Sequence, residues 1–225
     1  MSKGKLIVLE GIDGSGKSAQ YRRLCERMEK DKIAYNHIVF PRYDNESSAL
    51  IRLYLNGRFG SHPDDVNAYA ASTFYAVDRF ASYRDDWGSV YENGGLILSD
   101  RYTTSNAVHQ GSKLSDGELP EFFEWLSDLE HVKLGLPEPD LVLYLDVDIE
   151  TSLARMKKRQ EKNHNSADIH EKDVDYLCRC LHTADMAARH YGWRRIPFMK
   201  DGVEREVDEK NQELYDILLE AIGNK

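Results

Sequence analysis

The chain has 225 residues, of which 41% are hydrophobic, and its formal net charge is −9 at pH 7. This length suits a single α/β domain over residues 1–225 with one packed core. The negative charge argues against a broad surface for nucleic acid or an anionic membrane, but it permits a small anionic ligand held by local cations. The three cysteines form neither an even disulfide framework nor a metal-ligand cluster. With no secretory signal or long apolar span visible, we expect a cytoplasmic protein.

Apolar runs of strand length alternate with helical patterns along the chain. Strands are predicted at residues 6–10, 33–40, 96–98, 141–145 and 195–199. Helices are predicted at residues 17–30, 47–55, 66–87, 118–130, 149–160, 171–191 and 209–222. Near-continuous apolar strands are typical of a parallel sheet covered by helices on both faces. Ligands in such folds bind at the carboxyl ends of the strands, so we expect the chemistry there.

The first predicted strand leads into a glycine-rich turn that carries the most specific motif in the chain. Residues 11–18 match the pattern G-x-x-x-x-G-K-[ST] at every fixed position. In this pattern backbone N–H groups surround phosphate oxygens, the lysine reaches the β- and γ-phosphates, and the hydroxyl binds Mg²⁺. The alternative is a glycine turn without a ligand, which the flanking strand and helix disfavour. The residues expected to bind ATP are Gly11, Gly14, Ser15, Gly16, Lys17 and Ser18.

The ends of the later strands carry further candidates. Arg42 follows the second strand, where it can grip a second phosphate or remain a solvated loop residue. Asp100 and Arg101 end the third strand. The carboxylate can hold Mg²⁺ through water, and the guanidinium can neutralise charge on a transferred phosphoryl group. Asp146 and Asp148 follow the fourth strand and offer an alternative metal ligand, but we expect them to cap the next helix.

Tyr75 and Arg79 stand four residues apart on a predicted helix, so they share one face. An aromatic ring beside a guanidinium suits a planar base, because the ring can stack on the base and the guanidinium can donate a directed hydrogen bond to it. The alternative is a core tyrosine beside a surface arginine, and the spacing alone favours that alternative.

The helix predicted at residues 149–160 ends in a basic run. Arg155, Lys157, Lys158, Arg159 and Lys162 are followed by a polar stretch without periodicity. Such a segment can close over a triphosphate as a lid, excluding water and bringing cations to the transition state. The alternative is a solvated charged face.

Six segments carry a family resemblance through their joint order: residues 9–18, 40–43, 75–79, 100–111, 135–141 and 168–171. The fourth of them follows the pattern D-R-Y-x-x-S-x-x-x-x-Q-G. Together they resemble the thymidylate kinase family of P-loop nucleoside-monophosphate kinases over nearly the whole chain. The resemblance implies a P-loop NTPase fold with a five-stranded parallel sheet and a mobile lid at about residues 155–171. It also implies transfer of the γ-phosphate of Mg²⁺–ATP to dTMP, giving dTDP for dTTP synthesis, and a homodimer.

The resemblance also implies roles for individual residues. Catalysis would rest on Lys17, Arg101, Asp13, Arg155 and Arg159. The acceptor would be bound by Asp13, Arg42, Tyr43, Tyr75, Arg79, Arg101, Ser105, Asn106, His109 and Glu171. Within this set Arg42 would hold the dTMP phosphate, Tyr75 would stack near thymine, and Arg79 would bond its O4. Mg²⁺ would be held by Ser18 and by Asp100, the latter through water, while Asp13 would face either the sugar 3′-hydroxyl or the metal.

The chain departs from the family pattern at positions that bear on the acceptor. Tyr75 stands where phenylalanine is usual, and His109 stands near the sugar where many members have tyrosine or phenylalanine. These departures keep open a related kinase that acts on dUMP, UMP or a deoxynucleoside. The phosphate loop has no arginine or lysine between Gly11 and Gly16, which favours charge supplied by the lid, from Arg155 or Arg159.

A rival from another class is a catalytically silent nucleotide-binding protein that kept the fold. The presence of Lys17, Ser18, Asp100 and Arg101 together argues against it. A P-loop GTPase is disfavoured because the chain has no N-K-x-D stretch to recognise guanine.

Overall fold

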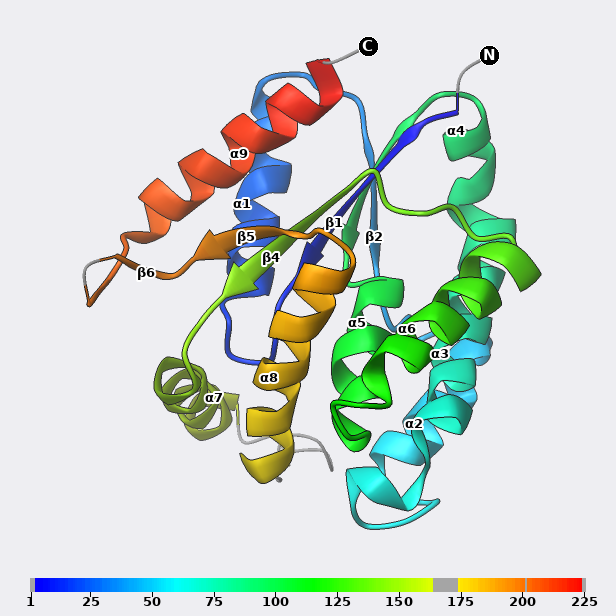
Figure 1. The fold of residues 1–225 in the computed structure, drawn as a ribbon. Coiled ribbons are helices and arrows are strands. Elements are labelled where there is room, and N and C mark those ends of the chain that lie inside the picture. The colour runs from blue at the N-terminus through cyan, green and yellow to red at the C-terminus, as the bar shows by residue number, and fades with distance from the viewer. Residues whose placement is uncertain (1–2, 164–173, 201, 224–225) are drawn as a thin grey trace.

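The computed structural model describes residues 3–163, 174–200 and 202–223, with the side chains of residues 159–163 outside that description. A five-stranded parallel sheet forms its centre, with strand order β2-β3-β1-β4-β5 (Figure 1). The strands are β1 (Lys5–Glu10), β2 (Asn36–Val39), β3 (Leu96–Asp100), β4 (Leu141–Asp146) and β5 (Arg194–Pro197). The predicted sheet is confirmed, and β2 is shorter than the expected 33–40.

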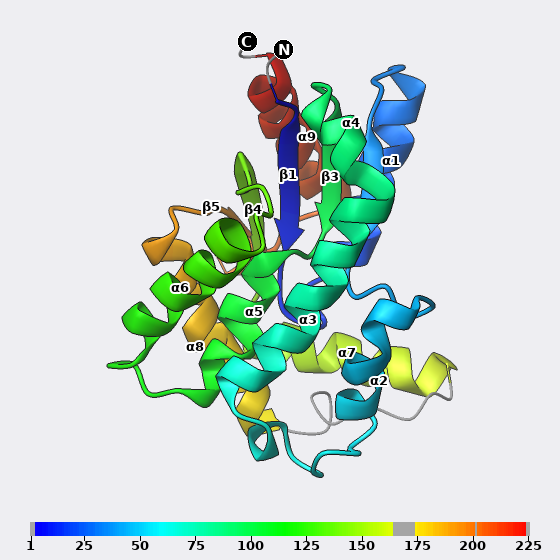
Figure 2. The ribbon, with the colours of Figure 1, turned by 90° about the vertical axis from the view of Figure 1, so that its right-hand side faces the viewer.

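Helices cover both faces of the sheet. They are α1 (Lys17–Lys30), α2 (Ala49–Leu55), α3 (Ala68–Ser82), α4 (Gly88–Glu92), α5 (Thr103–His109), α6 (Leu119–Ser127), α7 (Ile149–Asn163), α8 (Val174–His190) and α9 (Val207–Gly223). Helices α1 and α9 lie side by side on one face, and α3, α4, α5, α6 and α8 lie on the other (Figures 1 and 2). Helices α2 and α7 flank the end toward which the strands point (Figure 1). No helix in the described part of the chain is long and apolar enough to cross a membrane.

The central strand β1 is buried on both faces, as its uninterrupted apolar run predicts. Leu6, Ile7, Val8 and Leu9 are each 0% exposed. The register pairs Leu9 with Asp100 of β3 and with Leu143 of β4. The glycine-rich loop after β1 therefore emerges beside the Asp100–Arg101 step, as the parallel topology predicts.

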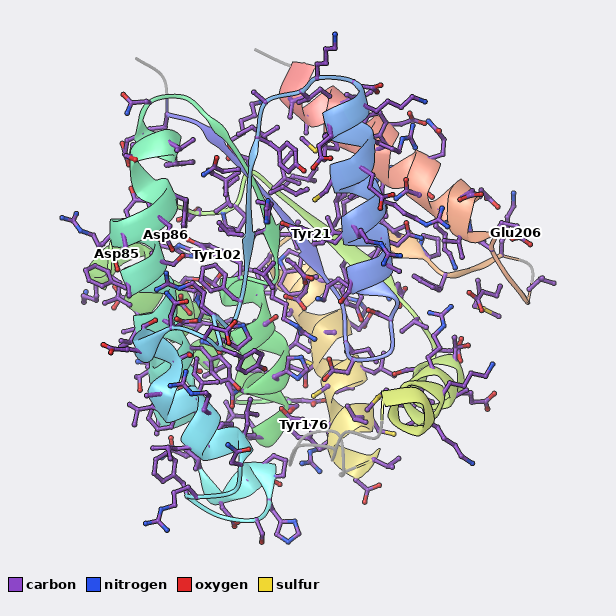
Figure 3. The ribbon with its side chains drawn as sticks, turned by 180° about the vertical axis from the view of Figure 1, so that it is seen from behind. Tyr21, Asp85, Asp86, Tyr102, Tyr176 and Glu206 are labelled. Atoms are coloured by element: carbon purple, nitrogen blue, oxygen red, sulfur yellow. The ribbon has the colours of Figure 1, made fainter. Side chains whose placement is uncertain are left out.

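Helix α1 is held on the sheet by Tyr21, which points from the helix toward the strands (Figure 3). Its hydroxyl lies 2.8 Å from the carbonyl oxygen of Leu98 in β3 and 3.1 Å from that of Ile38 in β2. Burial raises the pKa of the phenol above its ordinary value, so the hydroxyl stays protonated as a donor. This contact helps to set where α1, and hence the loop that precedes it, sits over the strands.

Two structural elements near the site were not predicted. Helix α5 was not expected because its Thr, Ser and Asn residues are weak helix formers, and all of its residues except Ser105 are buried, so it carries no amphipathic stripe. A short antiparallel hairpin of β6 (Met199–Lys200) and β7 (Val203–Glu204) follows β5. In addition, the helical stretch expected at residues 66–87 is confirmed from Ala68 onward and continues to Glu92, with a π-helical segment at Tyr83–Trp87 that joins α3 to α4.

Substitution of Gly4 by alanine is expected to destabilise the fold. A Cβ at this position would lie 2.0 Å from the carbonyl oxygen of Gly95 and 2.9 Å from that of Tyr91. Because these are backbone atoms, the start of β1 must move, and such overpacking typically costs about 1–3 kcal/mol. For a chain of this size the midpoint of thermal unfolding should fall by roughly 2–10 °C, measured by circular dichroism.

Gly117→Ala is the matched control. A Cβ on Gly117 meets nothing within 4 Å, so this variant should unfold close to the wild-type temperature. Equal unfolding temperatures for the two variants would contradict the clash at Gly4.

Candidate active site

A cavity of about 460 Å³ opens where the carboxyl ends of β1 and β3 meet. It joins the glycine-rich loop to residues of α3, α5 and α7. Of the residues predicted for the site, it is lined by Asp13, Gly14, Ser15, Gly16, Lys17, Ser18, Tyr43, Tyr75, Arg79, Asp100, Arg101, Ser105, Asn106, His109 and Arg155. The lining does not include Gly11 or Arg42. Glu171 and the side chain of Arg159 lie outside the described residues.

The glycine-rich loop takes a shape that only glycine adopts easily. Gly14 and Gly16 have φ angles of 78° and 83°, and α1 begins directly after Gly16 at Lys17. A Cβ on Gly14 would also lie 2.4 Å from the carbonyl oxygen of Ser152. The Ser152 hydroxyl donates a 2.5 Å hydrogen bond to the carbonyl oxygen of Asp13, which ties the loop to α7. The start of α1 is thus presented to the cavity, where a helix N-terminus favours an anion.

Lys17 and Asp100 form a buried ion pair at the floor of the cavity. Burial and the neighbouring Arg101 guanidinium lower the pKa of Lys17, while Asp100 opposes that shift. Asp100 therefore holds the Lys17 ammonium, and a bound phosphate group can take the place of this carboxylate as the partner of Lys17.

Arg101 lies at the centre of the site in a backbone conformation that is uncommon for arginine. Its φ angle is 67°, while its N–H donates to the carbonyl oxygen of Leu9 at 3.0 Å. The guanidinium donates to Asp13 Oδ1 at 2.7 Å through Nη2 and to Ser105 Oγ at 3.2 Å through Nη1. Nη1 also lies 3.0 Å from Nε2 of His109. One side chain thus connects the phosphate loop to α5.

Glu10 lies beneath Arg101 and was not predicted as a site residue. It is 0% exposed, and its Oε2 accepts hydrogen bonds from the hydroxyls of Thr104 at 2.6 Å and Ser105 at 2.7 Å. Its Oε1 lies 3.5 Å from Nη1 of Arg101. Burial lowers the pKa of Arg101, but the carboxylates of Asp13 and Glu10 more than offset it, so the pKa stands above its ordinary value. The signal that could have identified Glu10 is a charged residue ending an otherwise apolar strand.

The pair Tyr75 and Arg79 faces the same cavity from α3. Tyr75 is half-buried, whereas Phe74 beside it packs against the rings of Tyr54 and Phe59 at centroid distances of 6.4 and 5.9 Å. Tyr75 is therefore the aromatic residue that this part of α3 presents to the cavity. The alternative of a surface arginine is wrong, because Arg79 is only 1% exposed.

Arg79 forms a bidentate pair with Glu130, a residue that sequence reasoning missed. Its Nε donates to Glu130 Oε2 at 2.7 Å, and its Nη2 bonds Oε1. Its Nη1 donates to the carbonyl oxygen of Tyr102 at 3.3 Å. Asn106 Nδ2 donates to Oε1 of the same carboxylate at 3.2 Å. A buried Glu130 therefore orients both Arg79 and Asn106 at this end of the cavity.

Gln110 also lines the cavity, and its Oε1 is a buried acceptor without a hydrogen-bond partner among the described residues. An unpaired buried acceptor costs about 1–3 kcal/mol, so a ligand donor at this position would relieve that cost. Gln110-Gly111 ends the motif at residues 100–111, which was the sequence signal for Gln110, although the sequence assigned it no role.

Arg42 lies beside the cavity, against acidic residues of the α3 segment. Its Nε lies 3.4 Å from Asp78 Oδ1, its backbone N–H donates to Asp78 Oδ2 at 2.9 Å, and its Nη1 pairs with Asp86. Asp78 is 1% exposed, and the neighbouring Tyr43 lines the cavity at 49% exposure. The structure thus brings Tyr43 into the cavity wall and directs the Arg42 guanidinium to these two carboxylates.

Among the cations predicted to belong to a lid, Arg155 of α7 reaches the phosphate loop in the described part of the chain. Its Nη1 donates to the carbonyl oxygens of Gly14 at 3.3 Å and Ser15 at 3.2 Å. The guanidinium also lies over the ring of Phe198, 4.7 Å from its centroid, and pairs with Glu204 of the hairpin. Lys157 and Lys158 are exposed on the same helix.

Asp146, the last residue of β4, and Asp148, which follows the strand, have different partners. Asp148 accepts a 2.8 Å hydrogen bond from the N–H of Thr151, which confirms its predicted capping of α7. This hydrogen bond lowers the pKa of Asp148. Asp146 instead pairs with Arg195 of β5 at 2.7 Å, so the capping predicted for it is wrong.

Replacing His109 by glutamine should reduce the sensitivity of the fold to acid. Burial and the nearby Arg101 guanidinium lower the pKa of His109 to about 4, below the ordinary value of 6.5. Between pH 6.5 and 4 the unfolded chain binds a proton at this histidine and the native state does not. The wild type should therefore lose about 3 kcal/mol relative to His109→Gln as the pH falls through that window. Urea unfolding at pH 7, 5.5 and 4 measures the difference, and parallel losses in both proteins would contradict it.

Comparisons with known proteins bear on what this site does. A family model described as thymidylate kinase matches residues 9–191. A thymidylate kinase of Mycobacterium tuberculosis is 29% identical over 192 residues, which cover 84% of this chain and 88% of that protein. A thymidylate kinase of Synechococcus sp. is 31% identical over 204 residues, which cover 87% of this chain and 88% of that protein.

A solved structure gives the same result for the fold. The thymidylate kinase of Candida albicans matches with a TM-score of 0.70 at 21% identity, covering 100% of this chain and 95% of that chain. The phosphate loop, Arg101 and the Tyr75–Arg79 pair all lie within the span of the family model. The chain belongs to the thymidylate kinase family, the ATP-dependent nucleoside-monophosphate kinases that phosphorylate dTMP to dTDP.

Proposed function

We propose that this chain transfers the γ-phosphoryl group of ATP to dTMP inside the cavity described above. The observation that carries this proposal is one continuous lining, in which the phosphate loop and the Tyr75–Arg79 pair meet at Arg101. A donor triphosphate on the loop and a monophosphate acceptor against α3 would then place their phosphates on opposite sides of Arg101.

The acceptor base is assigned to the α3 and α5 end of the cavity. Tyr75 stacks against thymine, and Arg79, held rigid by Glu130, directs an N–H toward O4. The unpaired Oε1 of Gln110 suits the ring N–H of thymine, since an imide nitrogen is a donor. Ser105, Asn106 and His109 complete the wall beside the base and sugar.

Mg²⁺ is assigned to the opening between the loop and β3. Ser18 is exposed at the start of α1, and Asp100 lies beside Lys17, so a hydroxyl and a carboxylate oxygen face the same space. In the described residues no group of three or more His, Cys, Asp or Glu side chains could hold a metal by itself. This donor set fits Mg²⁺, which keeps several waters and binds one or two protein oxygens together with nucleotide phosphates. When bound, the ion would neutralise charge on those phosphates.

The transfer itself needs little covalent work from the protein. The acceptor phosphate is already an anionic nucleophile, so no strong general base is required. Lys17 holds the donor phosphates, Arg101 bridges donor and acceptor, and Arg155 adds charge from α7. Asp13 orients Arg101 and lies where the sugar 3′-hydroxyl or the metal would approach.

Three further assignments rest on the resemblance and the placement of the residues. Arg42, clamped by Asp78 and Asp86, is assigned to the acceptor phosphate, with Tyr43 beside it. The single domain spans residues 1–225 with a lid at about 155–171, to which Arg159 and Glu171 belong. We place the enzyme in the cytoplasm, where both nucleotides are found.

The protein is assigned as a homodimer through the outer side of α2 and α3. Val77 and Phe80 stand three residues apart on α3 and are 52% and 39% exposed, and Leu50 and Leu53 on α2 are 46% and 42% exposed. The two helices pack against each other (Figure 2). Such apolar surface is better covered by a second copy than left in water.

A panel of acceptors tests the reaction. Activity is measured as ADP release from ATP with dTMP, dUMP, UMP or thymidine as acceptor. The value of kcat/KM should be highest with dTMP. The thymidylate kinase of Candida albicans has broad substrate specificity, so dUMP is the competitor of interest. A preference for thymidine over dTMP would refute the proposed acceptor.

The variant Arg101→Ala tests the role of the guanidinium. Its kcat should fall by at least about a hundredfold, because the charge bridging the phosphates is lost. An almost unchanged kcat would remove Arg101 from the mechanism.

A charged variant tests the dimer. Val77→Asp combined with Phe80→Asp should convert the protein to a monomer in light scattering coupled to gel filtration. Val203→Asp is the control, since Val203 is 68% exposed on the hairpin and belongs to neither helix. A dimer that persists in the double variant would rule out this surface.

A further inference from the structure

We propose that Cys180 of α8 is a positioning residue for Arg101, because its sulfur accepts the Nδ1–H of His109 and so keeps Nε2 of that ring as an acceptor for the guanidinium. The inference rests on the proposed role of Arg101 in the transfer. It assigns a function to a helix that contributes none of the described residues lining the cavity.

The tautomer of His109 follows from its contact with Arg101. The guanidinium Nη1 lies 3.0 Å from Nε2 of His109, and an arginine nitrogen can only donate. Nε2 must therefore carry a lone pair. The ring is buried and neutral, since burial lowers its pKa to about 4, so its one proton lies on Nδ1.

Cys180 receives that proton's hydrogen bond. Its Sγ lies 3.6 Å from Nδ1 of His109, within the range of a hydrogen bond to sulfur. Cys180 is 0% exposed, and burial raises the pKa of its thiol to about 12, so the thiol keeps its own proton. The S–H donates to Ser112 Oγ at 3.5 Å, and the Ser112 hydroxyl donates to the carbonyl oxygen of His109 at 3.0 Å. Each group in this chain of hydrogen bonds thus has its direction set by Arg101.

Helix α8 holds the ring from a second point. The Tyr176 hydroxyl donates to the carbonyl oxygen of His109 at 2.9 Å, and the two rings stack with centroids 6.3 Å apart. Tyr176 precedes Cys180 by four residues, so both face α5 from one side of α8. Figure 3 shows Tyr176 on α8. Helix α8 therefore holds the plane of the His109 ring and supplies the sulfur acceptor that matches the tautomer required by Arg101.

An apolar residue of similar size at position 180 would fill the space but remove the sulfur that accepts the Nδ1–H. The Nδ1–H tautomer would lose the stabilisation that this acceptor provides, and the ring would be held less firmly with Nε2 toward Arg101. Arg101 would lose one of the contacts that hold its guanidinium, and the effect should appear in the chemical step and not in acceptor binding.

The first test is the protonation of the His109 ring in the full chain. Nitrogen-15 NMR of the histidine-labelled, nucleotide-free enzyme, with His109 assigned by its loss in His109→Gln, should show a protonated Nδ1 and an unprotonated Nε2. A protonated Nε2 in the wild type would overturn the inference. This readout needs no substrate, so it is independent of the acceptor panel that tests the proposed function.

The second test separates position from packing. Cys180→Val should lower kcat for dTMP by about tenfold with the KM for dTMP within about twofold, as expected for a lost positioning hydrogen bond. Cys180→Ser keeps an acceptor and a donor and should restore most of kcat. Cys178→Val is the control, because Cys178 is exposed on the same helix. Wild-type kcat in a folded Cys180→Val, or equal losses in the valine and serine variants, would overturn the inference, and the NMR result decides it if the valine variant does not fold.

Discussion

The position of one guanidinium, that of Arg101, determines how the two halves of the site meet. Its backbone N–H continues the pairing of β3 with β1, yet its positive φ turns the chain out of the strand. A left-handed conformation costs a non-glycine residue about 1–2 kcal/mol. The buried carboxylate of Glu10, the partly exposed carboxylate of Asp13 and the acceptors on α5 stabilise it. Backbone strain is thus combined with a charge placed between the two proposed phosphate positions.

The cations of the cavity are each matched by a carboxylate. Lys17 pairs with Asp100, Arg79 with Glu130, Arg101 with Asp13, and Arg155 with Glu204. A cluster of positive groups would repel itself in the folded chain before nucleotide binds. Internal carboxylates remove that repulsion and fix the side chains, so the binding of phosphate exchanges one anionic partner for another. This arrangement reconciles a phosphate site with a chain of net charge −9.

The two ends of the cavity differ in rigidity. At the proposed base end, Arg79 is clamped by a carboxylate that is 0% exposed, and breaking such a pair costs about 3–5 kcal/mol. At the proposed donor end, Arg155 contacts loop carbonyls and pairs with Glu204, whose side chain is 41% exposed, so this ion pair is weaker. The buried pairing of Arg79 suits a preformed pocket for the proposed acceptor. The weaker pairing of Arg155 suits a donor side on which this cation can change partners.

The phosphate loop, the parallel sheet and the family could be predicted from the sequence alone, because glycine spacing and apolar runs are properties of contiguous segments. The spacing of Tyr75 and Arg79 also predicted that they share one helical face. The pairing of Arg79 with Glu130, 51 residues away, and the contact of Cys180 with the ring of His109, 71 residues away, are seen only in the folded chain. Helix α5 was not predicted for the same reason. Its residues are weak helix formers, and burial between elements that are distant in the sequence stabilises the helix. Pairings of this kind depend on sheet register and helix packing, which no local pattern records.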